Sequence, residues 1–220
     1  MSCSGGDGLD PGLLSEARQL MKARMDQFDP SHDSLHVERV YKLAVRVCES
    51  LTAEGKTVDM DVVQLAALFH DMDDHKYEGH GSAGSTIVEV MQKHNVPSQK
   101  IDLVLQIIRN TSYSKEQKAI REGTLTDWHR SCLELHCVQD ADRLDAIGAF
   151  GIYRVAAFSG AHGRPLYGPG DSAHQHFYDK LLKVKDSMKT PLGRRVADKR
   201  TDIMKQLVQA AEQEAVLGDF

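Results

Sequence analysis

The sequence predicts an all-α protein, a helical bundle that forms a single domain over residues 11–217. Apolar residues recur every three to four positions through almost the whole chain, which is the period of an amphipathic helix. The pattern contains no convincing strand-type alternation and no internal repeat. The chain has 220 residues, enough for one domain to bury a sizeable core. Residues 1–10 lack the pattern and are predicted to be a disordered tail.

The first helices are marked by caps and breaks. Asp10-Pro11 places a capping carboxylate before a proline at the first helical position, so a helix is expected to begin there. The second helix is expected from about Asp33 to Glu54, because Gly55 follows it. Three more helices are expected over about 59–71, 82–94 and 98–110.

The second half of the chain is expected to be helical after a polar stretch. Residues 111–128 are polar and poorly periodic, and no helix is assigned to them. A helix is expected over about 131–146, and it continues into the apolar segment 146–158. A loop rich in glycine and proline follows over 159–171. Two last helices are expected over about 174–188 and 193–216.

Composition excludes several classes of function. Lys plus Arg is 27 and Asp plus Glu is 32, so the net charge is −5, which argues against stable nucleic-acid binding and against binding to a membrane surface. No apolar stretch approaches the roughly 20 residues of a membrane span, and the first residues do not resemble a signal peptide. The four cysteines form no CxxC pair, so a reducing, cytoplasmic setting is expected.

Polar residues interrupt three apolar helical faces. His36 is in phase with Val40 and Val47, and the His70-Asp71 pair closes the face of the third helix. Asp142 directly follows an apolar position of the later helix. Each of these alone is more commonly a hydrogen-bonded core histidine or a helix cap. Together they predict one shared polar site, because buried imidazoles and carboxylates cost free energy unless they are paired or bind a metal.

The residue types indicate which metal such a site would take. Two imidazoles and two carboxylates suit one divalent cation such as Mn²⁺, Mg²⁺, Fe²⁺ or Co²⁺. The set contains no cysteine, which argues against a structural zinc site. Open coordination positions would hold water and a phosphate oxygen.

The same residues carry a family resemblance. The sequence resembles the HD-domain metal-dependent phosphohydrolases, whose pattern H…HD…D is matched by His36, His70-Asp71 and Asp142. It is similar in particular to a branch of small hydrolases through four extended motifs, which lie at 31–40, 65–76, 138–148 and 180–204. The resemblance covers roughly residues 12–215 and implies an all-helical fold with a divalent metal.

The resemblance also implies a reaction. Bacterial members of this branch are nucleoside triphosphate pyrophosphohydrolases, so the expected activity is the release of pyrophosphate from (deoxy)nucleoside triphosphates by metal-activated water. The alternatives are a nucleotide phosphomonoesterase or cyclic phosphodiesterase on the same site, or an HD domain that senses nucleotides without turnover. The expected partner is a small phosphorylated molecule, and the protein could form a homodimer.

Three neighbouring aspartates leave the fourth ligand open. Any of Asp140, Asp142 and Asp145 could bind the metal, and alignment with the family motif selects Asp142. On a helix, Asp140 would lie about 200° from Asp142 and point elsewhere. Asp145 lies three positions after Asp142, so it could orient a metal-binding histidine, pair with Arg143, or be solvated.

Catalytic and substrate-binding groups are expected next to these ligands. Asp74 is predicted to position the nucleophilic water or to move its proton, and Lys76 to bind a phosphate. Arg39, three positions after His36, could reach a phosphate or form an ordinary salt bridge. The roles of His75 and His80 stay open. So do those of Arg109, near the end of the fifth helix, and of the 160–170 loop, where Tyr167 could stack on a base or lie on the surface.

Overall fold

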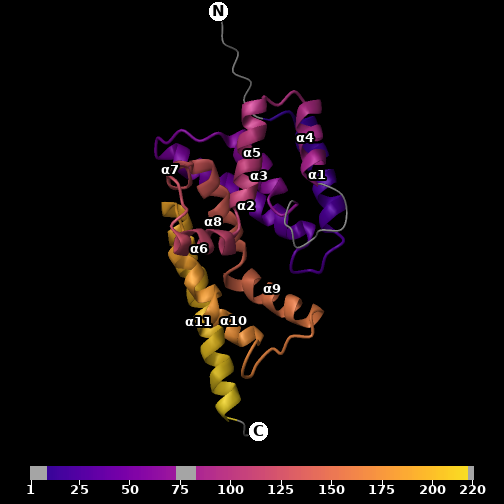
Figure 1. Ribbon diagram of the computed structural model, residues 1–220. Helices are drawn as coiled ribbons and strands as arrows, with labels where there is room; N and C mark the ends of the chain where they lie inside the picture. The colour runs from indigo at the N-terminus through magenta and orange to yellow at the C-terminus, as the bar shows by residue number, and fades with distance from the viewer. Residues whose placement is uncertain (1–8, 73–82, 218–220) are drawn as a thin grey trace, which may run out of the picture.

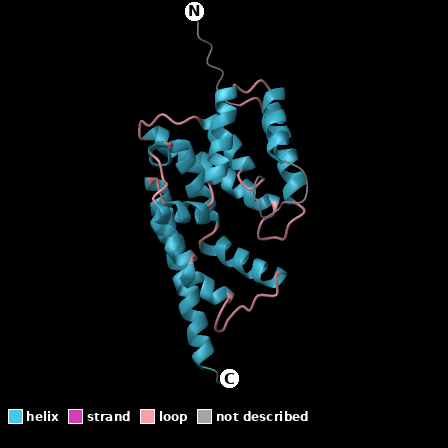
Figure 2. Ribbon diagram, in the orientation of Figure 1, coloured by secondary structure: helices cyan, strands magenta, loops and turns pink. Residues whose placement is uncertain are grey.

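The computed structural model describes residues 9–72 and 83–217, and no strand occurs in these two ranges. The all-α prediction is therefore confirmed (Figures 1 and 2). The segments 73–82 and 1–8 lie outside the described residues, and with them most of the expected tail. The helices are α1 (Pro11–Met25), α2 (Ser34–Ala53), α3 (Met60–Phe69), α4 (Ala83–Lys93), α5 (Ser98–Asn110), α6 (Tyr113–Glu122), α7 (Asp127–Ser131), α8 (Leu133–Asp145), α9 (Gly148–Ala161), α10 (Ala173–Asp179), a 3-10 segment η2 (Leu181–Ser187) and α11 (Pro191–Leu217).

The expected caps start the first three helices. The Asp10 carboxylate accepts the backbone N–H of Gly12 at 3.0 Å at the start of α1. The Asp33 carboxylate accepts the N–H of His36 at 2.9 Å, so the same bond that begins α2 also holds the backbone of a candidate ligand. Asp59 caps α3 in the same way.

Two apolar clusters meet at α8. The larger one contains the buried faces of α1 to α5, together with the apolar residues of α8. The smaller one lies among the end of α8, α10, η2 and the long helix α11. Figure 1 shows α9 and α10 below the other helices, and the long α11 running from the level of α6 and α8 down past them. The C-terminal end of α8 therefore lies where the two clusters join.

Three expectations about the second half were wrong in detail. Residues 111–128 contain α6 and the start of α7, and α6 is bounded by the Ser112 cap and by Gly123, which has a φ of 68°. The helix over 131–146 does not continue into the next segment, because Gly148 adopts a φ of 78° and begins α9. The expected helix over 174–188 is divided at Lys180, where the backbone has a φ of −134° and a ψ of −59°.

No helix among the described residues combines the length and the apolar character that crossing a membrane requires.

Candidate metal centre

His36 is held by a carboxylate on another helix. Its side chain is fully buried, and its Nδ1 lies 2.7 Å from Oδ2 of Asp145 on α8. An ionised carboxylate can only accept, so Nδ1 carries the proton and donates it. The opposite ring nitrogen, Nε2, is buried and has no hydrogen-bond partner.

His70 has the same arrangement at the end of α3. Its Nδ1 donates to the backbone carbonyl of Ala67 at 2.8 Å, and its Nε2 is also buried without a hydrogen-bond partner. The two histidine rings lie with their centroids 5.4 Å apart. In its neutral form each histidine therefore turns an unprotonated nitrogen toward the same point, as metal-binding histidines do when their other nitrogen donates to a fixed acceptor.

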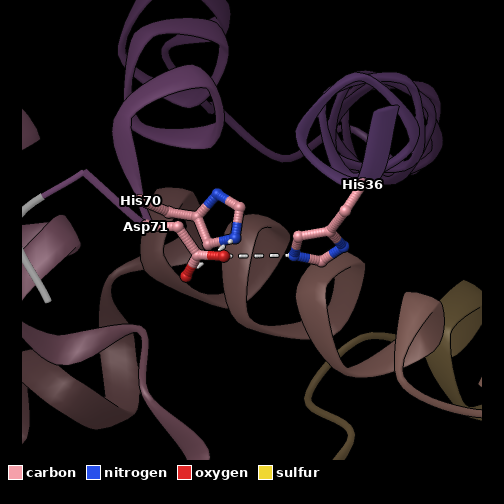
Figure 3. A group of neighbouring side chains, drawn as sticks. All are labelled: His36, His70 and Asp71. Carbon is pink, nitrogen blue, oxygen red and sulfur yellow. Dashed lines mark ion pairs between the residues drawn. The ribbon is translucent and has the colours of Figure 1, made fainter. Parts of the chain in front are cut away.

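Two carboxylates complete the cluster. Asp71 places one oxygen 3.3 Å from Nε2 of His36 and the other 3.4 Å from Nε2 of His70, as Figure 3 shows. Oδ1 of Asp142 lies 3.7 Å from each of these two nitrogens. The ligand atoms of His36, His70 and Asp71 all lie within 4.8 Å of one another. The structure thus brings together all four side chains that the sequence singled out.

This donor set fits a divalent cation. Lone pairs on two imidazole nitrogens and two carboxylates point at one small volume, and two of these atoms are buried acceptors without a donor. Such a group is costly unless a proton or a cation lies among its members. Burial lowers the pKa of His36, but the neighbouring carboxylates of Asp145 and Asp71 outweigh burial and raise this pKa overall. The same negative surroundings that raise this pKa would attract a metal ion.

Asp145 joins the metal cluster to two arginines. It accepts bonds from Nε of Arg39 at 2.7 Å and from Nη2 of Arg39 at 3.0 Å, and Nη1 of Arg154 lies 3.4 Å away. Burial raises the pKa of the Asp145 carboxyl, but the hydrogen bonds from His36 and Arg39 hold it well below its usual range. Of the three possibilities for Asp145, the orienting role is the one that its contacts match. Arg143 pairs instead with Glu116, at 3.0 Å.

Asp140 points away from the cluster, as its helical position predicted. Its carboxylate accepts the backbone N–H groups of Lys189 and Thr190, both at 2.8 Å, and the Thr190 hydroxyl at 2.7 Å. These hydrogen bonds therefore connect α8 to the residues that directly precede α11. The close packing there needs a glycine, because a Cβ at Gly193 would lie 2.2 Å from an Asp140 oxygen.

The other sequence-predicted residues have different positions. Arg39 is held on Asp145 and lies over the Phe150 ring at 4.4 Å, so its predicted phosphate contact stays a prediction. Tyr167 packs beside His174, with ring centroids 4.6 Å apart. The predicted catalytic pair, Asp74 and Lys76, lies outside the described residues. So do His75 and His80.

A cavity of about 310 Å³ opens onto the cluster. His70, Asp71 and Asp142 form part of its lining. Basic side chains form another part: Arg109, Lys115, Arg143, Arg154 and Lys180. Of these five, only Arg109 was expected near the site from the sequence. Arg154 and Lys180 come from α9 and the end of α10, where no local pattern distinguishes them from solvated basic residues.

A family model and several relatives match this arrangement. The model of the HD domain matches residues 34–147, which is more than half of the chain and contains all four clustered side chains. The chain belongs to the HD-domain family. It is 37% identical over 205 residues to the YpgQ protein of Bacillus subtilis, covering 91% of this chain and 94% of that protein.

Solved structures agree with this membership. The HD domain described here is similar to the crystal structure of Bacillus subtilis YpgQ in complex with ADP, with a TM-score of 0.74, 33% identity, and coverage of 91% of this chain and 97% of that chain. It is also similar to an HD-superfamily hydrolase from Bacillus thuringiensis, with a TM-score of 0.70, 30% identity, and coverage of 91% of this chain and 95% of that chain. Membership of the HD family supports a metal-dependent hydrolase.

The elements α9 to α11 lie beyond the matched segment and supply Arg154 and Lys180 to the cavity.

Proposed function

We propose that this HD domain is a metal-dependent phosphohydrolase that acts on nucleotides and releases pyrophosphate from (deoxy)nucleoside triphosphates. One observation carries the proposal: two unpartnered imidazole nitrogens and two carboxylates form one cluster, and the cavity that opens onto this cluster is also lined by five basic side chains. The acidic cluster suits a divalent cation and the basic groups suit phosphate oxygens. The similar YpgQ structure was solved with ADP, which favours a nucleotide ligand.

His36, His70, Asp71 and Asp142 would hold the ion, for which Mn²⁺, Mg²⁺, Fe²⁺ and Co²⁺ are the candidates. A bound ion of this kind supplies a Lewis acid and lowers the pKa of a water molecule. The protein supplies the rest. Asp145 keeps His36 in the tautomer that presents Nε2, and Asp74 would position the water or take its proton.

Charge neutralisation would come from the cavity wall. Arg154 and Lys180 would bind phosphate oxygens, with Arg109 and Lys115 on the same lining. Lys76 would add a further positive charge from the segment that follows the His70-Asp71 pair. These groups stabilise a phosphoryl group most where negative charge increases in the transition state.

Product analysis tests the proposal. The purified protein is incubated with nucleoside triphosphates, monophosphates and cyclic monophosphates in the presence of Mn²⁺, Mg²⁺ or Co²⁺, and the products are separated. We expect a nucleoside monophosphate and pyrophosphate from the triphosphates. Orthophosphate as the first product would identify a phosphomonoesterase, and ring-opened monophosphate a cyclic phosphodiesterase. Metal-loaded protein that binds nucleotides but releases no product would indicate the sensing function instead.

A further inference from the structure

A second cavity adjoins the one at the metal cluster. It has a volume of about 220 Å³, and four residues of its wall, His32, Ala146, Arg154 and Lys180, also line the first cavity. The proposed chemistry at His70 and Asp71 uses only the first cavity, because neither residue lines the second. A ligand bound at the metal cluster could therefore extend past Arg154 and Lys180 into this second space.

Three basic side chains from three segments line the second cavity. Arg154 comes from α9, Arg164 from the loop before α10, and Lys180 from the end of α10. No aspartate or glutamate occurs among the described residues of this lining. Burial first, and then the charges of Lys180 and Arg164, lower the pKa of His176 in the same wall. The positive charges thus act on a common space.

Both arginines of this lining are held in place by backbone carbonyl groups. Nε of Arg154 donates to the carbonyl of Ser31 at 2.7 Å, and Nε of Arg164 donates to the carbonyl of Asp171 at 3.1 Å. Arg164 also pairs with the Asp171 carboxylate, but the Asp171 side chain is 87% exposed whereas that of Arg164 is only 14% exposed. Such an exposed carboxylate is a weak competitor for an anion that enters the cavity, because water screens its charge.

We propose that the second cavity is a phosphate subsite, which binds the distal phosphate of a ligand whose reacting phosphate lies at the metal cluster. This inference rests on the proposed function and deepens it, because it makes a chain of at least two phosphates the preferred ligand. Arg164 is the specificity-determining residue, since it lines this cavity and not the metal cavity. Arg154 and Lys180, which line both cavities, would contact the ligand where it passes from one cavity into the other.

A nucleobase fits the second cavity less well. The one aromatic side chain among phenylalanine, tyrosine and tryptophan in its described lining is Phe158. One face of that ring is already stacked on His162 at 4.0 Å, and its edge meets His32 at 6.3 Å.

Binding of inorganic phosphates tests the subsite without relying on turnover. Titration calorimetry with the full-length, Mn²⁺-loaded protein compares tripolyphosphate, pyrophosphate and orthophosphate. We expect Arg164→Gln to weaken tripolyphosphate and pyrophosphate binding about 10- to 100-fold, the loss expected for one charge-assisted contact, and to change orthophosphate binding less than about twofold. Arg164→Lys should recover part of the affinity, because it restores the positive charge but not the bidentate geometry of the guanidinium group.

A matched control and two further ligands complete the test. Lys118→Gln removes a positive charge from the exposed α6 pair with Glu122, and it should change none of these affinities. Equal weakening of orthophosphate and tripolyphosphate by Arg164→Gln, or no weakening of either, would overturn the subsite. Selective loss of binding to adenosine or guanosine would overturn it too, because it would assign the cavity to the nucleoside.

The subsite and the proposed function can fail separately. If no nucleotide is hydrolysed but Arg164→Gln still discriminates between the inorganic phosphates, the subsite stands and the reaction is wrong. If triphosphates are hydrolysed to pyrophosphate while Arg164→Gln leaves tripolyphosphate affinity unchanged, the reaction stands and the subsite is wrong.

Discussion

Nδ1 of His36 lies 2.7 Å from Oδ2 of Asp145, which joins the start of α2 to the end of α8 across 109 positions of sequence. This bond determines which nitrogen of His36 faces the cluster. The same carboxylate is held by Arg39 and lies 3.4 Å from Arg154, whose side chain lines both cavities. The orientation of a candidate ligand and the charge of the cavity wall therefore depend on one buried aspartate.

Asp145→Asn should weaken metal binding while leaving the four proposed ligands in place. The amide carries no charge and can turn its NH₂ group toward His36, which would favour the wrong tautomer. Loss of such an orienting group typically costs about 10- to 100-fold in metal affinity. Calorimetric titration with Mn²⁺ measures this, with circular dichroism to confirm the fold and Asp127→Asn on the exposed α7 as control. Unchanged metal affinity would mean that Asp145 only pairs with Arg39 and Arg154 and does not orient His36.

His70→Ala and Asp71→Ala should each abolish the retention of metal. Each change removes one of the four proposed ligands, and the remaining set is incomplete. Metal content after purification and desalting is measured by atomic emission. His129→Ala, which alters a histidine outside the cluster, is the control. If either cluster variant retains stoichiometric metal and normal turnover, the assignment of the metal centre is wrong.

Asp74→Asn should keep the metal and lose turnover. Asp74 is proposed to act on the nucleophilic water and not to bind the ion. General acid–base groups contribute about 10²- to 10⁴-fold in rate, so kcat is expected to fall within that span. Steady-state kinetics, with metal content determined for the same samples, separate the two effects. A near-normal kcat would make Asp74 a bystander, and His75 or His80 would become the next residue to replace.

Lys76→Ala should act mainly on the substrate. The change removes a positive charge proposed to face a phosphate, so KM is expected to rise. kcat should fall as well if the charge contacts the transition state more strongly than the ground state. The measurement is a full substrate titration at saturating metal. A rate and KM equal to those of the unchanged protein would show that Lys76 is an ordinary surface lysine.

Asp140→Ala should destabilise the fold without removing the metal ligands. It deletes the acceptor of three hydrogen bonds at the start of α11, in a fully buried position. The unpaired buried donors should lower the free energy of unfolding by about 2–4 kcal/mol. Urea denaturation measures the loss. A folded Asp140→Ala variant that no longer binds Mn²⁺ would show that Asp140 takes part in the centre after all.

The sequence was sufficient for the elements that depend on local pattern. The 3.6-residue period, the Asp10 cap and the breaks between apolar stretches predicted α1 to α5 to within a few residues. The position of α6 was missed, because among its side chains only Glu116 is buried, so it has no apolar face to detect. The boundary between α8 and α9 was missed, because it depends on the left-handed backbone of Gly148, which packs against Arg200. Apolar pattern alone cannot reveal a turn of that kind.

The sequence by itself determined the fold class and the residues of the proposed metal centre. The histidines could be identified because polar side chains on apolar helical faces are conspicuous in the sequence, and the resemblance to the family motif selected Asp142 among its neighbouring aspartates. Tertiary structure alone decided among the roles left open for Asp145, and it alone brought Arg154, Arg164 and Lys180 together around one space. Each of these residues is locally indistinguishable from a solvated charge. Their function depends on contacts between segments far apart in the chain, and only the packing of α9 to α11 against α8 creates those contacts.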